Sequence, residues 1–174
     1  MVNKMSNKKE NKEDLDKLHK KFGVDCFNST WDLIDKGDSR TPDDDELMIH
    51  MVHSSVYHWL QVGKKVNFHR GAWQISKVYI LLSEKYPEHK LQALRYAQKS
   101  FDLWEEPSEV NGFADFDEGW ANEIMARANA ANGNKEEFRK YYDAANEAGK
   151  KQKKEGDKKY FYSELEKGPW FGMR

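Results

Sequence analysis

Histidine is concentrated in one part of this chain, residues 50–73, which holds four of the six histidines. His50 and His53 are three residues apart in a predicted helix, so both side chains would lie on the same face. Two imidazoles at this spacing could bind one divalent metal ion if another helix supplied a further ligand. Glu123 is the best candidate for that ligand. The pattern keeps open an alternative hypothesis, a metal-dependent helical protein and possibly a hydrolase.

The same histidines also fit a structural role, in which each imidazole forms hydrogen bonds inside a polar layer of a helical core. The sequence lacks the HExxH and ExxH motifs that are typical of helical metal sites. We therefore favour packed histidines and expect no cofactor. A divalent metal belongs only to the alternative hypothesis.

A second candidate site combines tryptophan, glutamate and arginine at helical spacing. Trp120, Glu123 and Arg127 are three and four residues apart and would share one helix face. A shift of 47 residues, without gaps, aligns Trp73 with Trp120. Stacked hairpins would bring both tryptophans to one groove with Arg70 and Arg127, whose guanidinium groups could hold a carboxylate or a phosphate. Alternatively, both tryptophans belong to the core and both arginines are structural.

From these patterns we predict a non-enzymatic binding protein with a polar and aromatic groove for a peptide or a small anionic ligand. The expected partner is a protein or a peptide, and the sequence leaves the oligomeric state open. The residues expected to line the groove are His53, Tyr57, His58, Arg70, Trp73, Trp120, Glu123 and Arg127.

Six to eight helices are predicted to position these side chains. Apolar residues recur three and four positions apart, and no segment is typical of a strand. Thr41 is a predicted N-cap, and Gly23 and Gly63 are predicted to end helices. The predicted helices cover residues 13–22, 27–36, 42–61, 66–85, 87–104, 115–131, 135–150 and 157–167. Trp170 and Phe171 are expected to pack back on the domain.

The predicted fold class is all-α, with antiparallel helical hairpins in a tetratricopeptide-like or α–α superhelical arrangement. The 47-residue shift also aligns Leu91 with Phe138, as expected for successive hairpins that bury their apolar faces against one another. Residues 1–10 are rich in lysine and asparagine and are predicted to form a flexible tail. Residues 11–174 have the length of one helical domain.

Composition excludes several classes of protein. The net charge of −1 gives no overall attraction to nucleic acid or to an anionic membrane surface. The mean hydropathy is −1.00, and no apolar run approaches the roughly 20 residues that span a bilayer. The N-terminus lacks the apolar stretch of a signal peptide. We expect a cytoplasmic protein with no nucleic-acid and no membrane partner, and the single cysteine excludes an internal disulfide.

Several of these motifs together resemble an uncharacterised bacterial family that is usually described as tetratricopeptide-like. The resemblance covers roughly residues 45–150 and rests on a YHW helix, an RGxW segment and an ARAxAxxGN hairpin end. The matching positions are His53, Tyr57, His58, Trp59, Gly63, Arg70, Gly71, Trp73, Glu123 and Arg127. The turn YPEHK and the extra N-terminal helices depart from the family pattern. The resemblance supports the fold class and implies no established activity.

Overall fold

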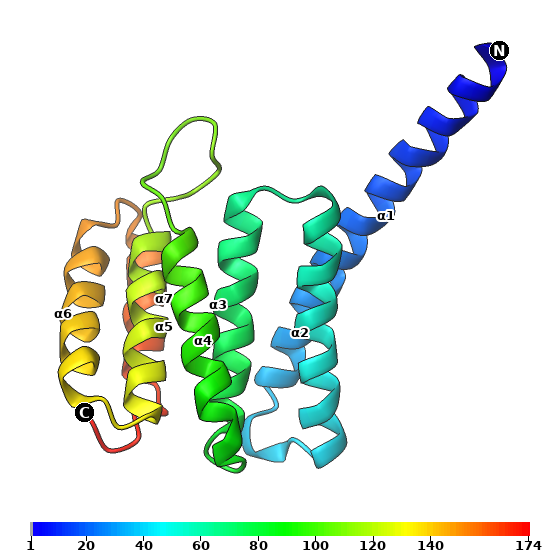
Figure 1. Ribbon diagram of the computed structural model, residues 1–174. Coiled ribbons are helices and arrows are strands. Elements are labelled where there is room, and N and C mark those ends of the chain that lie inside the picture. The colour runs from blue at the N-terminus through cyan, green and yellow to red at the C-terminus, as the bar shows by residue number, and fades with distance from the viewer. Residues whose placement is uncertain (1) are drawn as a thin grey trace.

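The described part of the chain, residues 2–174, is all-helical in the computed structural model, with only the backbone described for residues 2–10 (Figure 1). Two short 3-10 helices, Gly37–Ser39 and Pro87–His89, lie between α-helices. The α-helices are α1 (Val2–Ile34), α2 (Pro42–Val62), α3 (Lys65–Leu82), α4 (Lys90–Leu103), α5 (Asp117–Ala131), α6 (Lys135–Lys151) and α7 (Glu155–Glu166). This confirms the predicted fold class.

The helices form successive antiparallel hairpins. The pairs α1–α2, α3–α4 and α5–α6 pack most closely, and each pair lies beside the next (Figure 1). In addition, α3 contacts α1 and α5, and α5 contacts α7, so these four helices share one side of the molecule. The finer tetratricopeptide-like or superhelical arrangement stays a prediction.

The N-terminal helix corrects the predicted boundaries. Gly23 was expected to end a helix, but α1 continues through it and includes both segments predicted as separate helices. A Cβ at this glycine would lie 3.0 Å from the Trp59 ring, and the Gly23 carbonyl accepts a hydrogen bond of 2.7 Å from Ser55 Oγ. Gly23 therefore permits close packing of α2 on α1 and does not terminate the helix.

A flexible tail was predicted for residues 1–10, but the helix α1 already begins at Val2. Residue 1 and the side chains of residues 2–10 lie outside the described part of the structure. The flexibility of residues 1–10 stays a prediction.

The start and end of α2 follow the prediction. The Thr41 hydroxyl accepts the backbone N–H of Asp44 at 3.2 Å, and the Asp44 carboxylate accepts the backbone N–H of Thr41 at 2.9 Å. This reciprocal pair satisfies two backbone donors that the first helical turn cannot pair itself. At the other end, the backbone N–H of Gly63 donates to the Trp59 carbonyl.

The C-terminal segment packs back on the helices, as predicted. Trp170 is 7% exposed and joins the main apolar cluster, and Phe171 packs at its edge. The guanidinium carbon of Arg127 lies 4.2 Å from the centroid of the Trp170 ring. None of the described helices combines the length and apolarity needed to cross a bilayer.

Candidate functional site

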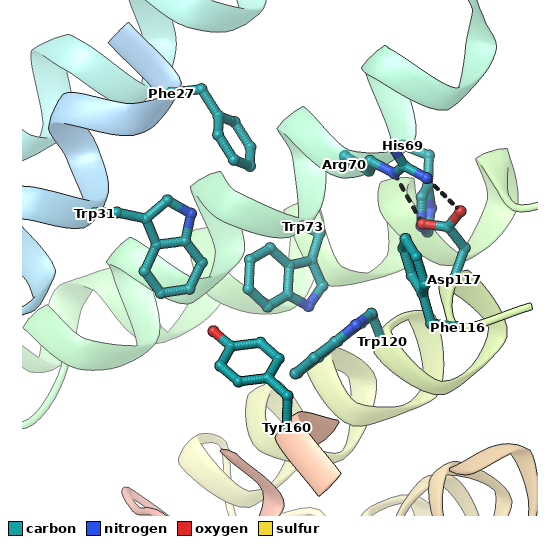
Figure 2. Close-up of a pocket in the computed structure, with 9 residues that line it drawn as sticks. All are labelled: Phe27, Trp31, His69, Arg70, Trp73, Phe116, Asp117, Trp120 and Tyr160. Atoms are coloured by element: carbon teal, nitrogen blue, oxygen red, sulfur yellow. Dashed lines mark hydrogen bonds and ion pairs between the residues drawn. The ribbon is translucent and has the colours of Figure 1, made fainter. Parts of the chain in front are cut away.

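An aromatic cavity of about 250 Å³ opens on the side shared by α1, α3, α5 and α7 (Figure 2). Six of its nine lining side chains are aromatic, and they come from α1, α3, α5, α7 and the residue that precedes α5. The lining residues are Phe27, Trp31, His69, Arg70, Trp73, Phe116, Asp117, Trp120 and Tyr160. The contributions of four helices mean that the cavity exists only when the hairpins are stacked.

Tryptophan rings form the centre of the aromatic cavity. Trp73, on α3, lies with its ring centroid 5.7 Å from that of Trp31 and 5.5 Å from that of Trp120. Tyr160 of α7 continues this series, 6.0 Å from Trp120. Trp31 and Trp120 are half-buried, and Tyr160 is 53% exposed, so parts of these rings remain accessible from solvent. Helical spacing contributes, because Phe27 and Trp31 are four residues apart on one face of α1.

An arginine–aspartate pair closes one end of the aromatic cavity. Arg70 donates from Nε and from its terminal nitrogen to the two oxygens of Asp117, at 2.9 and 2.8 Å (Figure 2). The Asp117 side chain is 2% exposed and also accepts the backbone N–H of Ala114 at 2.8 Å. The Arg70 guanidinium stacks 5.2 Å from the Phe116 ring centroid. This pairing is bidentate, so the Arg70 charge is already balanced.

His69 lies behind this pair and is fully buried. Its Nδ1 is 2.9 Å from the Ser100 carbonyl oxygen, which can only accept, so Nδ1 carries the hydrogen. Its Nε2 lies 3.7 Å from Asp117 and has no hydrogen-bond partner among the described residues. Burial lowers the pKa of His69 and favours the neutral imidazole, so this ring adds no positive charge to the cavity.

A buried ionic network lies beneath the aromatic cavity. The Glu123 carboxylate pairs with Arg127 at full burial and accepts the Trp73 indole N–H at 3.2 Å. Arg127 also donates to the backbone carbonyls of Glu164 and Lys167, at 2.7 and 2.9 Å. All this hydrogen bonding ties α5 to the end of α7. Each nitrogen of Arg127 is therefore already hydrogen-bonded within the protein, and the side chain does not line the cavity.

A second cavity, of about 580 Å³, adjoins the first and shares Trp31 and Tyr160 with it. We call it the lysine cavity, because Lys77 forms part of its wall. Its lining residues are Trp31, Ile34, Asp35, Lys77, Leu81, Tyr160, Glu164, Lys167 and Gly168. Lys77 is 4% exposed, and burial lowers its pKa to about 8, with the Arg127 charge acting in the same direction.

The residues that were predicted to line one groove lie in different parts of the structure. Arg70, Trp73 and Trp120 line the aromatic cavity, and their role in binding stays a prediction. Glu123 and Arg127 are brought to the same place but lie beneath it, in the buried network. Both residues are engaged within the protein, and for Arg127 this is the structural role that the sequence left open as an alternative.

The three remaining predicted residues lie elsewhere, on α2. His53 contacts the Tyr79 hydroxyl at 3.0 Å, and His58 Nδ1 lies 2.9 Å from His19 Nδ1 on α1. Tyr57 is 58% exposed and lies beside these rings. The reason is geometric, since this face of α2 packs on α1 and α3 and not toward α5. We call His19, Phe22, Tyr57 and His58 the histidine cluster.

The proposed metal ligands are not assembled. His50 is exposed and lies 3.8 Å from Glu46, whereas His53 contacts Tyr79 and Glu123 is buried against Arg127. Within the described part of the chain, no three histidine, cysteine or acidic side chains are grouped as a metal site would require. The geometry therefore gives the metal-dependent alternative no support.

The contributors to the two cavities that sequence reasoning missed include Phe27, Trp31, Lys77 and Tyr160. The spacing of Phe27 and Trp31 was a usable signal, because an aromatic pair at i,i+4 marks one helix face. The sequence contained no such signal for Lys77, since a lysine within a helix is ordinarily solvated. Comparisons with protein-family models, with curated proteins and with solved structures found no match to this chain.

Proposed function

We propose that this chain is a binding protein whose aromatic cavity takes an aromatic or apolar side chain of a peptide or of a small organic ligand. The observation that carries the proposal is the cavity of about 250 Å³, walled by six aromatic side chains from four helices and open to solvent. Ligand sites are commonly concave, mostly apolar and provided with few polar groups. This cavity has that composition.

The polar groups at the wall favour binding over catalysis. Arg70 and Asp117 are engaged with each other, and the neutral His69 faces a carboxylate at 3.7 Å. Such a pair fixes the wall of a site, but it offers no nucleophile activated by a base. What remains for a ligand is aromatic surface, and offset or edge-on ring contacts contribute about 0.5–1.5 kcal/mol beyond burial.

The direct test uses two capped amino acids, N-acetylphenylalaninamide and N-acetylalaninamide, which differ only in the ring. About 15 non-hydrogen atoms at about −0.3 kcal/mol each give about −4.5 kcal/mol, which corresponds to a Kd of about 0.5 mM. We expect saturable quenching of tryptophan fluorescence by the phenylalanine probe in this range and none by the alanine probe. Absence of saturation at ten times that concentration would contradict the proposal.

The Trp120→Ala variant locates the binding. Because the Trp120 ring contacts both Trp73 and Tyr160, its removal opens the wall, and we expect at least tenfold weaker binding of the phenylalanine probe. Circular dichroism and urea unfolding establish that the variant is folded. A folded variant that binds as tightly as the original would show that the probe binds elsewhere.

A further inference from the structure

Lys77 is a buried cation on the wall of the lysine cavity, and the structure leaves its charge without a matched partner. The residue is 4% exposed, and its Nζ lies 3.9 Å from Glu164 Oε2, beyond hydrogen-bond distance. No hydrogen bond from Lys77 Nζ to another described residue is present. A buried ammonium group of this kind is costly unless something hydrogen-bonds to it.

The two carboxylates nearest Lys77 are each paired more closely with another cation. Glu123 pairs directly with Arg127, and Glu164 pairs directly with Lys167. Of these three cations, Lys77 alone has no carboxylate within hydrogen-bond distance. Asp35 also lines the lysine cavity, but it is exposed and is not among the charges that shift the pKa of Lys77.

Lys77 is placed next to the aromatic cavity by the periodicity of α3. Trp73 and Lys77 are four residues apart, so they follow each other on one face at a rise of about 6 Å. Trp31 and Tyr160 line both cavities and connect them. A carboxylate and an aromatic ring joined by a short chain could therefore contact Lys77 and the tryptophans together.

We propose that the ligand is an aromatic carboxylate, with its ring in the aromatic cavity and its carboxylate hydrogen-bonded to Lys77 Nζ. This inference rests on the proposed function and names the chemistry of its ligand. A carboxylate would supply the hydrogen bonds that Lys77 lacks, and charge-assisted bonds of this type are the stronger ones. Arg127, which the sequence had suggested for this role, is already bonded to Glu123 and to two backbone carbonyls.

The test compares N-acetylphenylalanine with N-acetylphenylalaninamide, which share the ring and differ in the charge of the carboxyl group. A hydrogen bond to a charged group contributes about 10- to 100-fold in affinity. We expect the acid to bind at least tenfold tighter than the amide at pH 7. Equal binding of acid and amide would overturn the assignment of Lys77 and leave the proposed function intact. Binding of neither probe would overturn both.

The Lys77→Met variant should bind acid and amide equally, because no ammonium group remains to distinguish the two probes. The variant leaves no unpaired carboxylate, because Glu123 and Glu164 keep Arg127 and Lys167, so we expect it to fold with equal or higher stability. Lys140→Met, on the exposed face of α6, makes the same change in net charge and should preserve the preference for the acid. A preference that survives Lys77→Met would overturn the inference.

Raising the pH gives a test without any variant. The pKa of Lys77 is about 8, so its charge is present at pH 7 and is largely lost at pH 9.5, where the preference for the acid should be much smaller. The pKa values of Tyr160 and Lys167 are raised above their ordinary values, so neither group accounts for a loss in this interval. The titratable and charged groups that face Lys77 or line its cavity are Asp35, Glu123, Arg127, Tyr160, Glu164 and Lys167. A preference undiminished at pH 9.5 would contradict the role of Lys77.

The length of the probe distinguishes two sources of the same chemistry. A pentapeptide that ends in phenylalanine tests the C-terminus of a peptide, and 3-phenylpropionate tests a free aromatic acid. Binding of the pentapeptide at least as tightly as N-acetylphenylalanine would identify a peptide C-terminus. Binding of the short acids alone would identify a small-molecule ligand. If N-acetylphenylalaninamide binds but neither the pentapeptide nor 3-phenylpropionate does, the inference is overturned.

Discussion

The aromatic cavity and the histidine cluster contain similar residue types, but they are built differently. The histidine cluster lies between two sequential helices, α1 and α2, and its rings contact one another, with 2.9 Å between the Nδ1 atoms of His19 and His58. The aromatic cavity takes side chains from α1, α3, α5 and α7, and their rings enclose a space (Figure 2). A high local density of reactive residue types therefore does not by itself create a site. The cavity results from stacking of hairpins.

The two regions also differ in what lies behind them. The wall of the aromatic cavity is supported by the buried pair of Glu123 and Arg127, which bonds to the Trp73 indole. Next to the histidine cluster in the sequence, Gly23 and Trp59 pack closely, since a Cβ at Gly23 would lie 3.0 Å from the Trp59 ring. One region is held by charge and the other by contact. Four substitutions or conditions probe how the regions are held and which of them binds a ligand.

The largest effect is expected from Arg127→Ala. The change leaves the carboxylate of Glu123 buried without its partner and frees two backbone carbonyls, which costs about 3–5 kcal/mol of the free energy of unfolding. Urea unfolding measures this loss. The exposed pair of Lys140 and Glu137 provides the control, since Lys140→Ala should cost less than about 1 kcal/mol. Similar small losses for both variants would show that the network does not support the cavity.

A glycine on α6 tests the packing behind the aromatic wall. A Cβ at Gly149 would lie 2.7 Å from the ring of Phe161, which in turn packs 4.9 Å from the Trp120 ring. We expect Gly149→Ala to cost about 1–3 kcal/mol of the free energy of unfolding, because this buried ring cannot move freely. Gly156, with nothing within 4 Å, is the matched control, and Gly156→Ala should stabilise α7 by up to about 1 kcal/mol. Equal effects of the two changes would refute the packing argument.

Acidification is expected to weaken both regions. The pKa values of His53, His58 and His69 are lowered from 6.5, in each case chiefly by burial. Below pH 6.5 the unfolded chain binds protons that the folded chain does not, so the free energy of unfolding falls as the pH falls. Urea titrations at pH 7.5, 6.5 and 5.5 measure this slope. His69→Gln should reduce it, because this substitution removes one of the three groups. A flat profile over this interval would contradict the account.

Two exposed tyrosines compare the regions as binding surfaces. Tyr160 lines the aromatic cavity and is 53% exposed, and Tyr57 belongs to the histidine cluster and is 58% exposed. We expect Tyr160→Ala to weaken binding of N-acetylphenylalanine about tenfold, or about 1.4 kcal/mol, with little change in stability. Tyr57→Ala should leave the binding unchanged. If Tyr57→Ala weakens binding more than Tyr160→Ala in a fluorescence titration, the ligand binds at α2 and not in the aromatic cavity.

Local signals in the sequence predicted most of the helices, because caps and periodicity act within a few residues. The N-cap at Thr41 and the turn before α6 are examples, and both follow from nearby side chains and glycine. The role of Gly23 could not be predicted in this way, since its reason is a contact with α2. A helix-ending glycine and a glycine at a helix crossing have the same appearance in one sequence.

The candidate site was predictable only in part. Trp73 and Trp120 could be placed together from the repeat, and they do lie in contact. Burial of Arg127 depends on the carbonyls of α7 and on the Trp170 ring, and the exposure of Lys77 to a cavity depends on the same distant segment. Whether Arg127 or Lys77 is hydrogen-bonded within the protein is therefore decided by tertiary contacts, which the local sequence does not show.

The most direct test of the aromatic cavity is an amide-correlated NMR spectrum of the indole N–H groups during addition of N-acetylphenylalanine. The chain has six tryptophans, three that line the cavity (Trp31, Trp73 and Trp120) and three that lie elsewhere (Trp59, Trp104 and Trp170). Single Trp→Phe variants assign the signals. We predict that the first three signals move together on one saturable curve while the other three stay in place. Movement of the second set alone, equal movement of all six, or no movement would contradict the aromatic cavity as a ligand site.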